Sequence, residues 1–149
     1  MRRQGGFTLV ELMVVIAILG ILGATAIPVF QTWRQRSYGS EAYVTIKNLL
    51  EGEILYYLEH DTFYPPGEQP ILIPREGPYT PEMEKYIEDI ADNLKINIPV
   101  DHNLGYQVRN YGPELYVIIS AGFPLYKDGH RELHGHLTNK GKMEIFPGG

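Results

Sequence analysis

An uninterrupted apolar block near the N-terminus constrains this chain more than any other feature. Residues 7–30 carry a single charged side chain, that of Glu11, and residues 12–30 carry none. A helix needs about 20 consecutive apolar residues to cross the hydrocarbon layer of a membrane. A helix that is apolar on every face does not suit a small soluble domain, and 149 residues suffice for one ordinary domain. We therefore predict that residues 7–30 form a membrane-spanning helix.

A cleaved secretory signal is the alternative explanation of this block. Such a signal combines basic residues with about 7–15 apolar residues and a small-residue cleavage site. The block here is longer, and a helical pattern continues directly after it. Arginines at positions 2, 3, 34 and 36 flank it almost symmetrically, so the positive charges decide its orientation only weakly. We expect the block to stay in the mature protein.

The residues at the start of the block form a motif. Gly5 and Gly6 are followed by Phe7 and, four residues later, by Glu11. This pattern resembles the prepilin cleavage and methylation motif of the type IV pilins and type II secretion pseudopilins. In that motif a short basic leader ends in glycine, the mature chain begins with phenylalanine, and its fifth residue is glutamate. Gly20 and Pro28 also stand where pilins commonly have these residues.

The resemblance implies a course of processing and assembly. Residues 1–6 would be a leader that a prepilin peptidase removes on the cytoplasmic side, between Gly6 and Phe7, and the new Phe7 amine would be methylated. The single-pass subunit would then stand in the bacterial inner membrane with its globular part outside the cytoplasm. An inner-membrane assembly platform would add it to a periplasmic or extracellular filament. Its partners would be copies of itself and other pilins or pseudopilins.

Three residues of the block have expected roles. A carboxylate in hydrocarbon is unfavourable unless it is paired, and the helix of Glu11 offers it no basic residue within reach. The resemblance implies that Glu11 meets the Phe7 amine of a neighbouring subunit and sets the register of assembly. The alternative is a solvated carboxylate at the level of the lipid headgroups. Gly20 and Pro28 should loosen or kink the helix, and the resemblance implies that this stretch can melt during assembly.

Beyond residue 30 the helical pattern becomes amphipathic. No proline interrupts it between Val29 and Phe63, and apolar residues recur at three- and four-residue steps. We expect one helix from Phe7 to Leu58, whose second half, within residues 31–60, packs this stripe against the rest of the chain. The stripe comprises Ala42, Ile46, Leu49, Leu50, Ile54 and Tyr57.

Residues 61–149 are predicted to complete a globular domain together with residues 31–60. The proline-rich stretch 60–81 is expected to be a loop, and a short helix is expected to begin at Pro81 after the capping residue Thr80. The predicted fold class is α+β, a long N-terminal helix packed on a small antiparallel sheet, as in pilins. Four segments are strand-like, namely 104–109, 115–121, 131–138 and 142–146.

Few residues suggest a metal site. His134 and His136 point to one face of a predicted strand, with Asp128 nearby, but a pair of surface histidines is the simpler explanation of this pattern. Ser120 to Gly122 with Asp128 vaguely resembles the calcium loop of major pseudopilins. That loop supplies only one acid here, whereas calcium prefers six to eight oxygen ligands. Calcium is the one cofactor considered, and we expect none.

Charge and missing motifs exclude other classes of function. Residues 51–99 hold 11 acidic and 3 basic residues, so we expect no nucleic-acid partner for this region. In a filament, this acidic region could meet Arg34, Arg36 or Lys47 of a neighbour. The chain has no cysteine, no phosphate-binding loop and no nucleophile elbow, so we expect no enzyme.

The predicted function is structural, as a subunit of a type IV pilus or a type II secretion pseudopilus. Pilins often close their C-terminal region with a disulfide, and the absence of cysteine tilts the prediction slightly toward a pseudopilin or a disulfide-free pilin. The alternative is a minor pilin at a filament tip, whose globular domain binds a ligand through the histidine cluster and the proline-rich loop. The sequence does not separate a major from a minor subunit.

Overall fold

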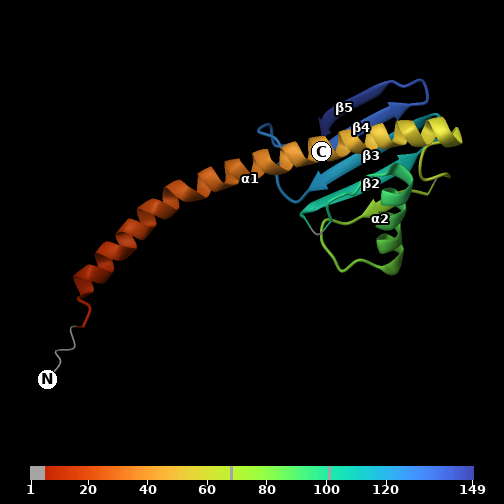
Figure 1. Ribbon diagram of the computed structural model, residues 1–149. Coiled ribbons are helices and arrows are strands. Elements are labelled where there is room, and N and C mark those ends of the chain that lie inside the picture. Colours follow the sequence, from red (N-terminus) through yellow and green to blue (C-terminus); the bar gives the residue numbers. More distant parts are fainter. Residues whose placement is uncertain (1–5, 68, 101) are drawn as a thin grey trace. The chain divides into compact units, whose positions relative to one another are not determined.

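The computed structural model describes residues 6–67, 69–100 and 102–149. It is an α+β fold, as predicted, with a long N-terminal helix and an antiparallel sheet (Figure 1). The chain divides into two compact units, residues 1–34 and Gln35–Gly149, and we call the second unit the head. The elements are α1 (Leu9–His60), β1 (Ile71–Ile73), α2 (Pro81–Leu94), β2 (Leu104–Asn110), β3 (Glu114–Ala121), β4 (Glu132–Thr138) and β5 (Met143–Gly148).

Helix α1 contributes to both units. It begins and ends within two residues of the predicted bounds. None of its residues from Leu9 to Arg34 is buried, whereas its second half carries a buried stripe. Helix α1 continues through Pro28, where the proline removes the N–H that would bond the carbonyl of Ala24.

The sheet is a meander in which each strand pairs with the next in an antiparallel manner, in the order β1-β2-β3-β4-β5. The four predicted strands are confirmed, but the prediction of a plain loop over residues 60–81 is wrong, because β1 lies within it. This strand is only three residues long and stands between Pro70 and Pro74. A pattern so short gives no readable alternation, and proline is tolerated beside an edge strand.

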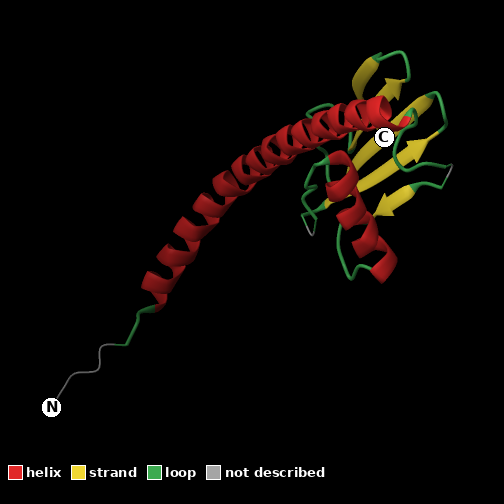
Figure 2. Ribbon diagram, turned by 45° about the vertical axis from the view of Figure 1, so that its right-hand side comes forward, coloured by secondary structure: helices red, strands yellow, loops and turns green. Residues whose placement is uncertain are grey.

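The core lies between the sheet and the second half of α1 (Figure 2). Alternate residues of β3 and β4 point toward it, and Gly135 lies where α1 approaches most closely. A Cβ atom at position 135 would stand 2.9 Å from the Leu50 side chain and 3.1 Å from that of Ile46. The absence of a side chain at Gly135 therefore allows α1 to pack closely against β4.

The predicted stripe of α1 packs against the core along its whole length, but the prediction omitted Glu53 and Tyr56, which are more deeply buried than its last two members. Ala42, Ile46, Leu49 and Leu50 are buried, but Ile54 and Tyr57 are only partly buried. Glu53 and Tyr56 continue the alternating steps of four and three residues from Ala42. The prediction chose Ile54 and Tyr57 because they are apolar, and so it missed this regular spacing.

Helix α2 packs its last turns on the core and lies on the α1 side of the sheet (Figure 2). Its predicted cap is confirmed, because the Thr80 hydroxyl accepts a hydrogen bond from the Met83 N–H at 3.3 Å. Ile90 and Leu94 are buried, and Lys95 ends the helix in a left-handed conformation. The end of α2 lies against α1 at Gly52, where a Cβ atom would stand 2.9 Å from the Leu94 carbonyl oxygen.

Candidate functional site

The start of α1 brings Thr8 and Glu11 together. The Glu11 carboxylate accepts hydrogen bonds from the Thr8 N–H at 2.9 Å and the Thr8 hydroxyl at 2.8 Å, while the Thr8 hydroxyl oxygen accepts from the Glu11 N–H at 3.2 Å. This reciprocal arrangement is a capping box, which satisfies amide groups that a helix start leaves free. Sequence reasoning missed Thr8, although the spacing Thr-x-x-Glu is itself the signal for such a box.

Phe7 and Gly6 precede this box and are exposed. Phe7 is 84% exposed, so neither its side chain nor the peptide bond before it is protected by the fold. Residues 1–5, which complete the predicted leader, lie outside the described residues. The position of the predicted cleavage bond is thus accessible to a peptidase in the isolated chain.

The first half of α1 exposes large apolar side chains on every side. None of its most apolar window is buried within the protein, and α1 is long and apolar enough to cross a membrane. Soluble monomers rarely leave so much contiguous apolar surface uncovered. This segment therefore requires an apolar environment outside its own chain. The large apolar side chains of this segment that are more than half exposed are Leu9, Val10, Leu12, Met13, Val14, Ile16, Ile18, Leu19, Ile21, Leu22, Ile27, Val29 and Phe30.

The two helix-weakening residues lie inside this exposed segment. A Cβ atom at Gly20 would have no neighbour within 4 Å, so no contact within the chain demands glycine there. The Thr32 hydroxyl donates a hydrogen bond to the Pro28 carbonyl oxygen at 3.0 Å, one turn back along the helix. The predicted melting of this stretch during assembly remains a prediction.

A buried carboxyl group in the head was missed by the sequence reasoning. The Glu53 side chain on α1 is fully buried, and one of its oxygens accepts a hydrogen bond from the Tyr64 N–H at 2.8 Å. Its other oxygen has no hydrogen-bond partner among the described residues. Burial raises the pKa of Glu53 to about 8, and the bond from Tyr64 offsets this rise only in part. Glu53 therefore ties the loop after α1 to the helix as a neutral acid near pH 7.

Asn110, at the end of β2, holds the same loop from the other side. Its side-chain amide donates to the carbonyl oxygens of Phe63 and Pro65, at 2.7 and 3.0 Å. Its carbonyl oxygen accepts from the Gly112 N–H at 2.7 Å, which also shapes the β2–β3 turn. The proline-rich segment is thus anchored where it leaves the helix.

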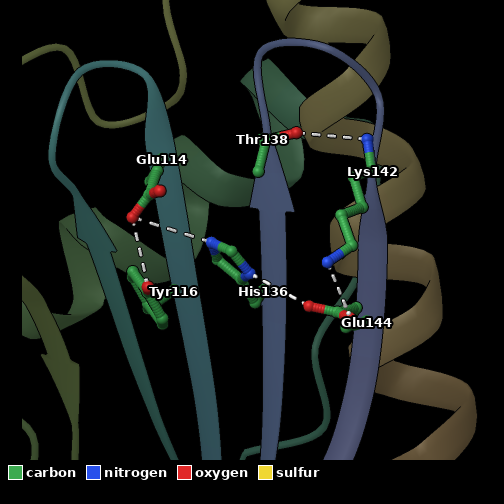
Figure 3. A network of polar contacts seen from close by, with 6 residues as sticks. All are labelled: Glu114, Tyr116, His136, Thr138, Lys142 and Glu144. Atoms are coloured by element: carbon green, nitrogen blue, oxygen red, sulfur yellow. Dashed lines mark hydrogen bonds and ion pairs between the residues drawn. The ribbon is translucent and has the colours of Figure 1, made fainter.

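His136 is the centre of a polar network on the outer face of the sheet (Figure 3). Its ring stacks on Tyr116 of β3, with ring centroids 4.5 Å apart, and stands between Glu114 and Glu144 at 3.8 and 3.6 Å. Lys142 approaches Glu144 to 3.0 Å and, together with His136, lowers the pKa of that carboxyl. The network links three neighbouring strands through side chains.

The other metal candidates do not join this network. His134 and His136 share the outer face of β4, as predicted, but His134 contacts Glu132 at 2.9 Å. Asp128 lies near His130, at 3.8 Å. No three histidine, aspartate or glutamate residues of the described part of the chain are grouped so that they could hold a metal ion. Contacts with a neighbouring carboxylate, on β4 for His134 and in the β3–β4 loop for His130, account for these side chains.

Comparison with known proteins finds relatives of this chain and a family model that matches its N-terminal segment. Residues 1–27 match the family described as the prokaryotic N-terminal methylation motif. Over 88 residues, 59% of the chain, it is 37% identical to the type IV major pilin protein PilE1 of Neisseria gonorrhoeae. Over 61 residues, 41% of the chain, it is 46% identical to the type IV major pilin protein PilA of Myxococcus xanthus. The N-terminal segment therefore carries the prokaryotic methylation motif, and the chain is similar to type IV major pilins over part of its length.

The likeness to these pilins is partial. The matched stretches span 39% of the Neisseria relative and 28% of the Myxococcus relative. A fimbrial protein of Moraxella nonliquefaciens is 51% identical over 49 residues, which are 33% of this chain and 32% of the relative. No solved structure matches the chain. The family model matches only the first 27 residues, so the head has to be understood from its own residues.

The segment that vaguely resembles the calcium loop of major pseudopilins contains a glycine that lies beside an arginine. Gly122, which follows β3, lies beside Arg75, so that a Cβ atom at position 122 would stand 2.9 Å from a guanidinium nitrogen. The positive charge of this guanidinium group would disfavour a calcium ion bound in the same segment. Asp128, the one acid of that loop, has its carboxylate within 3.8 Å of the His130 ring.

Proposed function

We propose that this chain is a structural subunit of a type IV pilus, which polymerises after residues 1–6 are removed. The observation that carries this proposal is the uncovered apolar half of α1, which begins two residues after Phe7 of the methylation motif. Before assembly the inner membrane would cover this segment, with the head outside the cytoplasm. In the filament, neighbouring copies of the same segment would cover it.

The processing roles follow from the exposed start of the chain. Gly6 would be the residue before the cleaved bond, since it has no side chain to obstruct a peptidase. Phe7 would become the methylated N-terminus, and Glu11 would then lie one helical turn from a new positive charge. In a filament, the amine of the next subunit would approach Glu11, and the two charges would pair in the apolar core. Prepilin peptidase and an inner-membrane assembly platform are the partners that this course requires.

Mass spectrometry and filament purification test the proposal. The gene is expressed in a bacterium that makes type IV pili but lacks its own major pilin. We expect sheared surface filaments that contain the chain beginning at Phe7, with a net charge of −7, because the leader contributes the two positive charges of Arg2 and Arg3 to the −5 of the full chain. A Gly6→Val variant should keep residues 1–6 and form no filaments, whereas the matched Gly5→Val variant should be processed.

Other outcomes would decide against this function. A mature chain that keeps Met1 to Gly6 would contradict the proposed processing. Correct processing without surface filaments, together with a secretion defect when the gene is deleted from its own bacterium, would favour a pseudopilus. Filaments in which the chain is rare beside another subunit would favour the minor pilin at a tip.

A further inference from the structure

A groove opens on the head where α1 meets the loop between β3 and β4. Its volume is about 440 Å³, and its lining includes Arg36, Gly39, Tyr43, Val44, Leu125 and Lys127. At its floor the helix and the loop touch, because a Cβ atom at Gly39 would stand 2.7 Å from the Leu125 carbonyl oxygen. Tyr43 and Val44 are 50% and 56% exposed along one side. The groove therefore combines an apolar wall with two cations.

These two cations are uncommitted within the head. Arg36 and Lys127 are both exposed, and neither takes part in an ion pair among the described residues. Lys47, the next cation along α1, is already within 3.7 Å of Glu51. The groove thus presents unneutralised positive charge beside exposed apolar surface.

Helix α2 carries a row of negative charges beside apolar side chains. Glu84, Glu88 and Asp92 are exposed at four-residue steps and form one acidic row, and none of them has an ion-pair partner among the described residues. Like charges four residues apart on a helix repel each other. Met83 and Ile87, which are partly exposed, form an apolar row directly beside the acids. The repulsion within the acidic row lowers the stability of α2 in the isolated head. A partner surface with positive charges and apolar side chains would relieve this repulsion and cover the apolar row.

We propose that the groove binds α2 of a second copy of this chain, with Arg36 and Lys127 facing the acidic row and Tyr43 and Val44 facing Met83 and Ile87. This inference rests on the proposed function, because it names the head-to-head contact within the filament. At both surfaces the charged side chains have no ion-pair partner among the residues that the structure describes, so they are available to pair across the contact. Electrostatic complementarity of this kind fixes the register of an interface and disfavours wrong partners.

The positions of the two surfaces favour an open filament. The groove meets α1 at Gly39, whereas the end of α2 meets α1 at Gly52, 13 residues further along the helix. At 1.5 Å per residue, the two surfaces attach to α1 about 20 Å apart along its axis. A contact between two different surfaces of identical subunits repeats without closing unless its rotation forms a ring. The contact therefore adds subunits with an axial stagger.

Charge reversal in the full chain tests the contact. One variant carries Arg36→Glu with Lys127→Glu, a second carries Glu84→Lys with Glu88→Lys, and a third carries all four changes. We expect each of the first two to lower the yield of sheared filaments about tenfold at an unchanged membrane pool of processed subunit, and the third to restore it. Control variants of equal charge change carry Arg131→Glu with Lys140→Glu, or Glu59→Lys with Glu76→Lys.

Cross-linking supplies a second, independent measurement, because the chain has no cysteine of its own. Two single variants, Lys127→Cys and Glu88→Cys, are expressed together, and the filaments are treated with a short bis-maleimide. We expect a covalent dimer that joins one chain of each kind. The matched pair Arg131→Cys and Glu88→Cys should give little of it.

The outcomes separate this contact from the proposed function. Normal filament yield in both charge-reversed variants, or cross-linking no stronger than in the control pair, would overturn the contact while the filament itself stands. Failure of the unaltered chain to form filaments would overturn both. Rescue by the four changes together with the covalent dimer would establish the contact.

Discussion

At the scale of single residues, Glu53 is the group with the clearest pH dependence. Its pKa is raised to about 8 in the folded head by burial, from an ordinary value of 4.5. The folded state therefore keeps a proton that the unfolded chain loses above about pH 4.5. The free energy of unfolding should then fall as the pH rises from about 4.5 to about 8, by at most about 1.4 kcal/mol per pH unit.

Replacement of Glu53 by glutamine should remove this loss. The amide oxygen still accepts from the Tyr64 N–H, but the side chain has no proton to lose. We expect Glu53→Gln to match the natural head near pH 5 and to exceed its stability by roughly 2–4 kcal/mol at pH 8.5. Urea unfolding across this pH range measures the difference, with the exposed Glu59→Gln as the control. Parallel curves for both variants would show that Glu53 does not titrate in this range.

The capping box gives Glu11 two separable roles. Glutamine can replace glutamate in such a box, so Glu11→Gln should keep the helix start while removing the charge. Membrane insertion and cleavage after Gly6 should survive, since a neutral side chain crosses hydrocarbon more easily. Assembly should fail, because the Phe7 amine of the incoming subunit is left unpaired at a cost of about 3–5 kcal/mol.

Filament yield against the membrane pool measures this effect of Glu11→Gln. The matched variant Thr8→Val removes the capping hydroxyl but keeps the charge, so it should weaken the first turn by about 1 kcal/mol and still assemble. A Glu11→Gln chain that assembles normally would leave Glu11 with its capping role alone.

At the scale of elements, one helix face holds the head together. Leu50 is fully buried between α1 and the sheet, whereas Leu58 on the same helix is 76% exposed. Leu50→Asp buries a carboxylate in the core and should leave the head unfolded, since the loss of about 3–5 kcal/mol uses much of a small domain's stability. Leu58→Asp should change the free energy of unfolding by about 0.5 kcal/mol or less. Thermal unfolding by circular dichroism compares the two.

The elements also show what the sequence could and could not predict. The apolar block, the Thr80 cap and the strands β2 to β5 follow from local patterns, because spacing and turn residues determine them within a few residues. Strand β1 could not be predicted, since three residues between prolines become a strand only by pairing with β2. Glu53 was missed for a related reason. Its spacing is that of the buried face, but the usual charge of a glutamate argues against burial. The raised pKa and the Tyr64 N–H bond that allow Glu53 to be buried arise only in the folded head.

At the scale of the whole molecule, the two units differ in how their apolar side chains are removed from water. All the buried apolar residues of the core lie between Ala42 and Leu137, within the head. The exposed large apolar residues from Leu9 to Trp33 all lie within the first unit. Folding of the head therefore needs no membrane, whereas none of the described residues of the first unit, 6–34, is buried within the chain, so this unit depends on its surroundings.

A head that starts at Gln35 should accordingly be soluble, monomeric and cooperatively folded. It retains the buried stripe of α1, both faces of the α1–sheet contact and α2. Its contact to another copy through the groove and α2 is built from a few exposed charges and should be too weak to hold a dimer without the filament core. With no cysteine in the chain, reductant should leave its melting temperature unchanged. Sedimentation and thermal unfolding with and without reductant measure these properties. Persistent aggregation of residues 35–149 in every buffer would show that the stripe from Ala42 to Tyr56 is not covered by its own sheet.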